Sequence, residues 1–408
     1  MKNRSIFLSM RLAIIAVALF TGQFALAAVA SLAPMPANML LGLNSSDVSA
    51  ITQYATANMK PLISTLVNGL DIAKDITVMQ NVKNKADMPK LAISKGFKPY
   101  TGTFASEDST AVYTNRQLSL SVGQRDMLID PEDYRNSFLA QFAAPGASPD
   151  NIQAQVPFKQ FLFDQVIKKL SAEINDMTAY FGFDKTTATA WGAGSTYAVG
   201  DIVTYTQNSV SKYFECLAIT TAAQSPDTHP AKWNDVSAGA VAPGIKSFVS
   251  SITGTNAVTT GAISSSATGL AAALVLYRAI PAAYRNENMV MHVSFTDFDY
   301  IVSGLLETYG KYTMDDINTM GGVFLPMAAK KCLIKPASWL GTSRRMLLEQ
   351  ANPADNWRGL NLHMGTDLTS DINQIKVLER AYKLELAIKF GIGFQVADLS
   401  AIWKNDQA

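Results

Sequence analysis

The chain has 408 residues, of which 48% are hydrophobic and 16% charged, and its 34 Lys and Arg against 33 Asp and Glu give a formal net charge of +1. A chain of this length and hydrophobicity is expected to bury a sizeable core and to hold more than one domain, which excludes bulk disorder. The balanced charge argues against a protein that grips nucleic acid along its length or reads its sequence, because such proteins carry a basic excess.

The N-terminus has the pattern of a secretory signal. Basic residues at Lys2, Arg4 and Arg11 precede or open an apolar run over residues 12–20, and the small-residue stretch 25–27 (Ala-Leu-Ala) follows. The run is too short to span a bilayer. Two other interpretations stay open for this stretch, namely an extended N-terminal arm and translation from an upstream start codon.

The next part of the chain changes from helical to extended spacing. Residues 45–78 alternate polar and apolar positions at helical intervals, whereas residues 78–93 and 112–129 read as two long strand-like arms. A Gly-, Ser- and Thr-rich tip at residues 100–110 separates the arms. This hairpin has too few apolar residues to pack on itself, so we expect it to project and to lie on another surface. Asp130-Pro131 then marks the start of a helix.

A long amphipathic helix is predicted after residue 156. Pro157 stands at its first turn and Gly182 lies just beyond its end. One continuous apolar stripe over about five turns predicts a core helix that packs on a sheet. The stripe consists of Phe163, Val166, Ile167, Leu170, Ile174, Met177 and Phe181.

Residues 187–240 read as a small all-β unit between two small-residue linkers, TTATA and SAGAVAPG. Its aromatic, glycine and turn residues follow a pattern made by Trp191, Gly194, Tyr197, Gly200, Asp201, Val203, Tyr205, Tyr213, Cys216, Ser225, Pro226 and Trp233. This pattern resembles the chitin-binding-type modules of carbohydrate-binding families 5 and 12. The resemblance implies that exposed aromatic rings stack on sugars, with Trp191, Tyr205 and Trp233 as candidates; alternatively, the rings hold the core of so small a unit.

No catalytic residue, cofactor site or metal site is predicted. The chain lacks the G-x-S-x-G, H-E-x-x-H and G-x-x-x-x-G-K-[ST] motifs, and the strand-end motif of barrel-type chitinases is absent. Two acidic pairs fit helix starts as well as a carboxylate pair for glycoside hydrolysis. Neither cysteine has metal-ligand or disulfide spacing, and the three histidines are scattered. These residues are Asp297/Asp299, Asp315/Asp316, Cys216, Cys332, His229, His292 and His363.

Near the C-terminus the chain carries an N-L-x-x-G-T-D-x-x-x-D-x-x-x-I pattern. The pattern is occupied by Asn361, Leu362, Gly365, Thr366, Asp367, Asp371 and Ile375. Together with the order of the segments before it, this pattern resembles the major capsid proteins of tailed bacteriophages, most closely those of crAss-like and related Bacteroidetes phages, in which such a motif precedes the strands closing the peripheral domain. Residues 78–91, 129–139 and 156–175 resemble the family's hairpin and spine-helix segments, and residues 325–341 resemble a strand near its central domain.

The resemblance implies an α+β Hong Kong 97-like capsid fold with an N-arm, an extended hairpin, a spine helix, and peripheral and axial domains, interrupted by the all-β insertion. The expected divisions are residues 1–44, 45–186, 187–240 and 241–408. The expected function is self-assembly into an icosahedral shell around a DNA genome, in hexamers and pentamers. The intersubunit hairpin would use Tyr100, Thr101, Phe104 and Tyr113.

The implied partners are copies of the chain and other capsid and portal proteins, with host or mucosal polysaccharide as a possible ligand of the insert, and neither a membrane nor sequence-specific nucleic acid. The protein would be assembled in the host cytoplasm and reside in the virion capsid. The alternative, favoured by the signal-like segment and the insert, is a secreted carbohydrate-binding or surface-layer protein.

Overall fold

A computed structural model describes residues 59–93, 99–100, 111–129, 158–310, 321–341, 343, 345–367, 374–380 and 383–405. Nearly all of them belong to one compact unit that spans Ala55–Met127, Val156–Lys376 and Ala387–Ala408. A second unit comprises Met1–Tyr54, Leu128–Gln155 and Val377–Leu386, and only its ends of strands β4, β16 and β17 are described. The signal-like segment, residues 130–157, the hairpin tip at 101–110, and Asp315, Asp316 and Asp371 lie outside the described residues.

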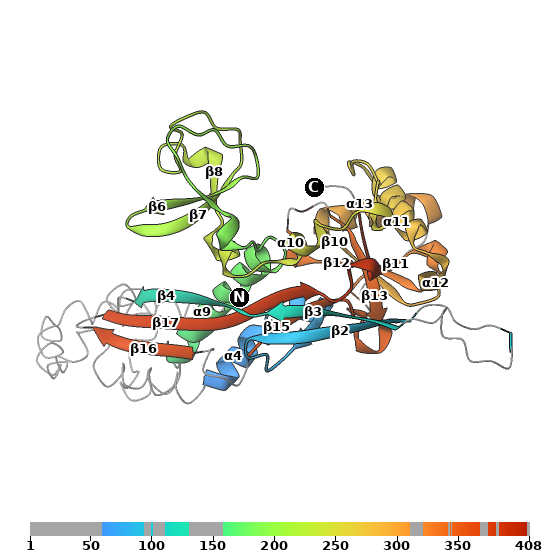
Figure 1. Ribbon diagram of the computed structural model, residues 1–408, viewed down its shortest axis with the longest axis horizontal. Helices are drawn as coiled ribbons and strands as arrows, with labels where there is room; N and C mark the ends of the chain where they lie inside the picture. Colours follow the sequence, from blue (N-terminus) through green and yellow to red (C-terminus); the bar gives the residue numbers. More distant parts are fainter. Residues whose placement is uncertain are drawn as a thin grey trace, which may run out of the picture. The chain divides into compact units, whose positions relative to one another are not determined.

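The architecture is mixed α+β, as the sequence predicts, with a seven-stranded and a five-stranded sheet (Figure 1). In the seven-stranded sheet the order is β11-β12-β10-β13-β18-β9, and β14 pairs with β13. Its strands are β9 (Ala257–Val258), β10 (Met289–Val293), β11 (Val323–Phe324), β12 (Cys332–Pro336), β13 (Leu347–Asn352), β14 (Arg358–Gly359) and β18 (Ile402–Asn405).

Two helices pack against the seven-stranded sheet and form its main core. Helix α11 (Ser266–Ala279) begins with a capping box at Ser265, and α13 (Phe295–Tyr309) begins at the N-cap Ser294 and ends at Gly310 with a φ of 68°. Gly304 lies where the two helices meet, because a Cβ there would stand 2.4 Å from the carbonyl oxygen of Ser266. Short helices α10 (Ile245–Val249) and α12 (Ala282–Arg285) complete this region.

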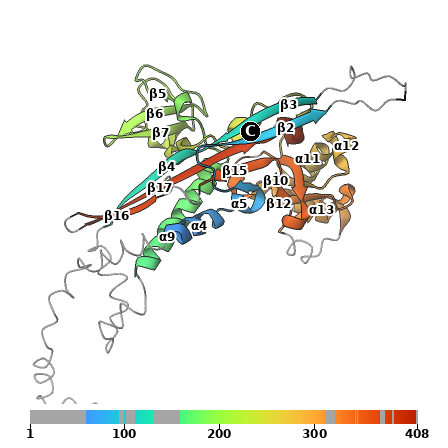
Figure 2. The same ribbon diagram turned by 60° about the horizontal axis from the view of Figure 1, so that its bottom comes forward.

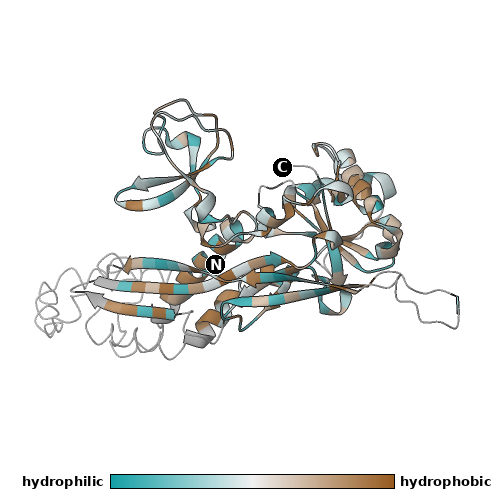
Figure 3. Cartoon of the chain, in the orientation of Figure 1, coloured by the Kyte–Doolittle hydropathy of each residue, from teal (hydrophilic) through white to brown (hydrophobic). Residues whose placement is uncertain are grey.

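The five-stranded sheet has the order β1-β15-β17-β16, with β4 also paired to β17. Hydrophobic and hydrophilic residues alternate along β17 (Figure 3), so that Ile388 and Phe390 are buried while Lys389 is exposed. The closing strands that the sequence predicts are therefore present. The strands are β1 (Thr77–Met79), β4 (Ser121–Ile129), β15 (Leu362–Thr366), β16 (Gln374–Arg380) and β17 (Lys383–Val396).

The predicted hairpin exists, but its second arm is divided between two sheets. Strand β2 (Lys85–Ile93) pairs antiparallel with β3 (Ala111–Ser119) over their whole lengths, and the two run side by side in both views (Figures 1 and 2). The chain then crosses at Leu120 into β4, which pairs with β17 instead. The prediction of one continuous arm over residues 112–129 was wrong at this point, since the alternation of residues does not reveal a change of partner strand.

The long helix of the sequence prediction forms as α9 (Phe158–Glu173), but it ends in a π-helical turn, η2 (Ile174–Ala179). Four members of the predicted stripe are buried, and Leu170, Met177 and Phe181 are half-buried. Helix α4 (Met59–Asn68) packs on α9, and α5 (Ile72–Asp75) follows it. We refer to α9 and η2 together as the spine helix. The four buried stripe residues are Phe163, Val166, Ile167 and Ile174.

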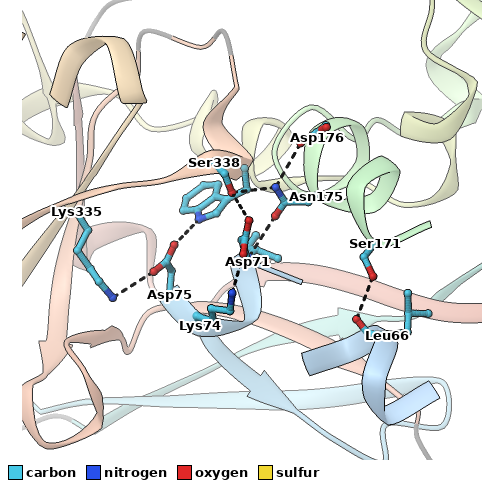
Figure 4. Close-up of polar contacts among 11 residues, drawn as sticks. Leu66, Asp71, Lys74, Asp75, Ser171, Asn175, Asp176, Lys335 and Ser338 are labelled. Atoms are coloured by element: carbon cyan, nitrogen blue, oxygen red, sulfur yellow. Dashed lines mark hydrogen bonds and ion pairs between the residues drawn. The ribbon is translucent and has the colours of Figure 1, made fainter. Parts of the chain in front are cut away.

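Buried polar contacts join α5 to the spine helix and to the seven-stranded sheet (Figure 4). Asn175 of η2 accepts a hydrogen bond from the backbone N–H of Ile72 at 3.3 Å and donates to Ser338 Oγ at 3.0 Å. One carboxylate oxygen of Asp75 forms an ion pair with Lys335 Nζ of β12 at 3.2 Å. The other accepts a hydrogen bond from Trp339 Nε1 at 3.0 Å. Because Asp75, Asn175 and Lys335 are nearly inaccessible to solvent, each bond also satisfies a group that burial would otherwise leave unpaired.

A buried carboxylate links the two large sheets. Glu349 on β13 accepts the backbone N–H groups of Asn361 and Leu362, where β15 begins, at 2.8 and 2.9 Å. Its other oxygen lies 3.1 Å from His292 Nε2 on the central strand β10, and both side chains are fully buried. The Asn-Leu start of the C-terminal sequence pattern is therefore fixed by a side chain of the other sheet.

The inserted unit is a four-stranded sheet in the order β5-β6-β7-β8. Its central strands are joined by a two-residue turn, Asn208-Ser209. Both residues have positive φ values, as two-residue hairpin turns favour. The strands are β5 (Thr189–Ala190), β6 (Ile202–Gln207), β7 (Val210–Cys216) and β8 (Trp233–Asp235). The core consists of Tyr197, Val203, Phe214, Cys216 and Trp233.

The burial along the spine helix predicts the effect of truncating its side chains. Ile167→Ala should lower the free energy of unfolding of the subunit by about 2 to 5 kcal/mol, because it removes a buried aliphatic side chain. Leu170→Ala should cost less, since Leu170 is only half-buried, and Lys168→Ala on the exposed face should be the near-neutral control. Urea unfolding of the three variants measures this order; equal losses for Ile167→Ala and Lys168→Ala would contradict it.

Candidate functional surfaces

The base of the β2/β3 hairpin is seated on the five-stranded sheet. Leu118 at the end of β3 is fully buried with Val82 and Met88. It lies on Gly365 of β15, where a Cβ would stand 2.3 Å from Leu118 Cδ2. Gly393 of β17 pairs with Gly365 and lies against Ser119, the residue after Leu118. A Cβ at Gly393 would stand 2.2 Å from the carbonyl oxygen of Ser119. The two glycines therefore leave room for Leu118 and for the backbone at the point where the chain passes from β3 to β4.

Polar contacts fix the same base to the end of β17. Lys90 Nζ lies 2.5 Å from Asp398 Oδ2, and Arg116 donates to Gln395 Oε1 at 2.9 Å. Gln395 in turn donates to the carbonyl oxygen of Gln117 at 2.9 Å. Both arms of the hairpin are therefore anchored within the subunit up to about residue 90.

Beyond that anchor the hairpin exposes apolar side chains. Leu91 and Tyr113 lie directly opposite each other in the register, and both are exposed, at 60% and 65%. Ile93, two residues farther along the same face, is 68% exposed. Tyr100 is 96% exposed, whereas Thr101 and Phe104 lie outside the described residues. The distal hairpin, by which we mean residues 91–93 and 111–113, thus presents an uncovered apolar face.

In the inserted unit the structure separates the three candidate stacking residues. Trp233 is 5% exposed, and its Nε1 donates to the carbonyl oxygen of Gln224 at 3.1 Å, so it belongs to the core. Trp191 and Tyr205 are half-buried and meet edge to face, with ring centroids 5.5 Å apart and planes at 88°. Because the two planes are perpendicular, a sugar ring can lie flat on only one of them at a time.

A chain of polar side chains begins at the Tyr205 hydroxyl. Asp227, which is exposed, accepts the Tyr205 hydroxyl at 2.9 Å and Gln207 Nε2 at 2.7 Å. Lys212 Nζ donates to Gln207 Oε1 at 3.1 Å. An aromatic face beside carboxylate and amide groups suits a ligand that has both apolar C–H faces and hydroxyl groups.

The acidic pair Asp297/Asp299 and the three histidines occupy different environments in the structure. Asp297 lies in the first turn of α13, where its backbone N–H donates to the N-cap Ser294, and it is buried while Asp299 is exposed. His292 is buried, His363 half-buried and His229 exposed. No group of three or more His, Cys, Asp or Glu side chains within the described ranges is placed to hold a metal ion.

Neither cysteine thiol is activated as a nucleophile. Burial raises the pKa of Cys332 to about 12 and raises that of Cys216, so both thiols stay protonated at neutral pH. A cavity of about 430 Å³ lies between α4, the start of α5 and the spine helix, and its lining includes Asp71, Asp164 and Lys168. A hydrogen bond from Lys74 lowers the pKa of Asp71, which keeps that carboxylate charged.

Comparison with known proteins gives structural likenesses only. Neither a protein-family model nor a curated protein sequence matches the chain. The chain is similar to a chain of the satellite phage P4 procapsid including size determination (Sid) protein, with a TM-score of 0.47, 10% identity, and coverage of 90% of this chain and 98% of that one. It is also similar to the capsid of the empty GTA particle (TM-score 0.41, 13% identity, coverage 83% and 90%) and to the capsid of Myoviridae phage XM1 (0.40, 10%, 81% and 88%). At such identities and with TM-scores below 0.5, the likeness assigns no function to this chain.

In the part of the chain that the structure describes, no helix has the length and apolar character required to cross a membrane.

The anchor at Lys90 predicts a pH dependence of the hairpin base. Burial alone would raise the pKa of Asp398, but hydrogen bonds from Lys90 and Ser400 outweigh it and hold that pKa below the ordinary 3.8. A carboxyl group with a lowered pKa stabilises the folded state above its ordinary pKa, and this contribution disappears as the pH falls through the lowered value. Hydrogen exchange of the β2 amides, corrected for intrinsic rates, should therefore accelerate below about pH 4.

Substitutions separate this anchor from general acid unfolding. Lys90→Met should accelerate exchange of the β2 amides by up to about fivefold at neutral pH, the range for a partly exposed ion pair. Lys85→Met, on the exposed part of the same strand, is the matched control. If Lys90→Met and Lys85→Met behave alike, the ion pair does not fix the hairpin.

Proposed function

We propose that this chain is a major capsid protein of a tailed bacteriophage, with a Hong Kong 97-like fold, which assembles with copies of itself into the shell of the virion. The observation that carries the proposal is the distal hairpin: a two-stranded arm whose base is fixed in its own subunit and whose outer part exposes Leu91, Ile93 and Tyr113. An apolar face on a projecting arm is costly for a monomer and is explained if another copy covers it.

The element order supports the same proposal. A projecting hairpin, a long helix, a helix-covered sheet and closing strands β15 to β17 follow one another as the resemblance to phage capsid proteins implies. The motif has a physical role in this chain, since Gly365 makes room for Leu118 and the backbone N–H of Asn361 donates to Glu349. Other capsid and portal proteins would be further partners, and assembly would take place in the host cytoplasm.

We further propose that the insert at residues 187–240 binds polymeric glycans on the outer surface of the shell. The proposal rests on the half-buried Trp191 and Tyr205 beside Asp227 and Gln207. A single site of this kind buries little area and binds weakly, but a shell carries many copies, and avidity would then hold the particle on a polysaccharide or mucin layer. A secreted carbohydrate-binding or surface-layer protein is the alternative that shares this insert and lacks shell formation.

Assembly can be tested by making the distal hairpin polar. The double variant Leu91→Ser/Tyr113→Ser should give a folded subunit that forms no closed shells, because both apolar contacts to a neighbour would be lost. Val210→Ser, an equally exposed aliphatic position on the insert, should assemble normally. Electron microscopy and sedimentation distinguish shells from free subunits. Normal shells from the double variant would exclude the hairpin as an intersubunit element, and discrete soluble particles from the unmodified chain would favour the secreted alternative.

Glycan binding can be tested on assembled particles by co-sedimentation with insoluble chitin and with mucin. Trp191→Ala and Tyr205→Ala should each lower the retained fraction, by about tenfold at limiting polymer, because stacking contributes about 1 kcal/mol or more and the loss is multiplied over many sites. Val199→Ala, an exposed position of the same unit, is the control. Particles that lack residues 185–236 should not be retained; equal retention of these particles would refute a glycan-binding role.

A further inference from the structure

The end of the spine helix has an unusual geometry. Residues Ile174–Ala179 form a π-helical turn directly after sixteen residues of α-helix. A π turn takes up one residue more than an α turn, so every side chain after it is rotated by about 100° from the position that a continuous α-helix would give. Such turns are uncommon and have poorer geometry than the α-helix, so something in the surroundings must favour this one.

The segment by which the chain returns from the insert lies directly on this turn. That segment is the 3₁₀ turn η5 (Ser237–Val241) with the residues up to Gly244. Thr178, nearly fully buried, donates its hydroxyl to the carbonyl oxygen of Ala238 at 2.9 Å. Three backbone bonds follow: Phe183 N–H to Gly239 O at 3.0 Å, Gly244 N–H to Gly182 O at 2.8 Å, and Lys246 N–H to Tyr180 O at 3.0 Å.

This contact is made by backbone against backbone. A Cβ at Gly182 would stand 2.3 Å from the carbonyl oxygen of Ala242, and a Cβ at Gly244 would stand 2.6 Å from the nitrogen of Gly182. Since the approach depends on both glycines, a small displacement of the return segment would break several of these bonds together. The small-residue linker predicted on the return side of the insert is thus held by hydrogen bonds to the host.

The return segment is also continuous with the fold of the insert. The carbonyl oxygen of Tyr213 on β7 accepts a hydrogen bond from the backbone N–H of Val236 at 2.9 Å. The backbone N–H of Tyr213 donates to Ser237 Oγ at 3.0 Å. Its ring meets Phe183 edge to face at 5.7 Å. The segment that includes η5 is therefore hydrogen-bonded to the insert on one side and to the end of the spine helix on the other.

The π turn determines what the spine helix presents to the seven-stranded sheet. Tyr180, 1% exposed, packs with its ring 6.3 Å from that of Trp339, and Phe181 meets Tyr180 edge to face at 5.0 Å. At the start of the turn, Asn175 bonds α5 and Ser338, which precedes Trp339 in the chain (Figure 4). A return to the α register would rotate Tyr180 away from Trp339 while leaving Asn175 almost in place.

We propose that the spine helix has two registers at its C-terminal end, and that the insert selects the π register through η5. The insert is then a conformational device as well as a displayed domain: it fixes the direction of Tyr180 and, through Trp339, the join between the spine helix and the seven-stranded sheet. This inference is independent of glycan binding and of shell formation, since it concerns the isolated subunit.

Hydrogen exchange of the unassembled full-length subunit, followed by mass spectrometry, tests the proposal. Thr178→Val removes only the hydroxyl bond to Ala238, and amides of residues 178–183 should exchange about fivefold faster, the factor expected for one neutral hydrogen bond. Replacing residues 185–236 by a short Gly-Ser link should accelerate the same amides about tenfold or more by allowing local opening. Tyr205→Phe, which alters only the hydroxyl bond to Asp227, is the control and should leave these amides unchanged.

A structure of the Gly-Ser variant decides the register directly. The expected result is α-helical geometry through Ala179, with Tyr180 displaced from Trp339. An unaltered π turn together with unaltered exchange at residues 178–183 would overturn the proposal. If the Gly-Ser variant does not fold, the comparison of Thr178→Val with Tyr205→Phe decides alone, and equal exchange in these two variants would refute the role of η5.

Discussion

The close approach at Gly365 and Gly393 is the constraint on which the arrangement of the larger strands depends. The two glycines are paired across β15 and β17, and neither position has room for a Cβ, because Leu118 and the backbone of Ser119 occupy that space. Here the chain leaves its pairing with β2 and enters its pairing with β17. The hairpin therefore starts from a fixed point in the sheet, and its direction is set before its exposed part begins.

Beyond that fixed point, the hairpin has an inner part that is anchored to the subunit and an outer part that is exposed. The inner part is tied to the subunit by Leu118, by the Lys90–Asp398 pair and by Arg116 on Gln395. The outer part has no such ties among its described residues; it exposes Leu91, Ile93 and Tyr113 on one face and Val112 on the other. A rigid base with an uncovered apolar end suits an element that reaches a neighbouring copy, since little entropy is lost in positioning it.

The insert is likewise attached to the host fold through a small set of close contacts. Its chain leaves and returns where Gly182 and Gly244 pass each other in hydrogen-bond contact, so a unit of about fifty residues is accommodated without opening the host fold. Ordered contacts of η5 with Thr178 and Phe183 make this attachment stiff. In the proposed glycan-binding role, a fixed orientation of the insert would favour simultaneous engagement of many copies.

The sequence by itself determined the periodic features: the apolar stripe of the spine helix, the two arms of the hairpin, the closing strands and the all-β insert, because burial on one face leaves a repeating pattern. It also identified Gly365 and Asn361 as parts of a motif, without their partners. The tertiary structure alone decided that Trp233 is a core residue and that the spine helix ends in a π turn. It also decided that residues 112–129 divide into β3, which pairs with β2, and β4, which pairs with β17. Each of these depends on contacts between segments far apart in the chain, such as Gly365 with Leu118 or Thr178 with Ala238, and no local pattern of residue types records which distant backbone will approach.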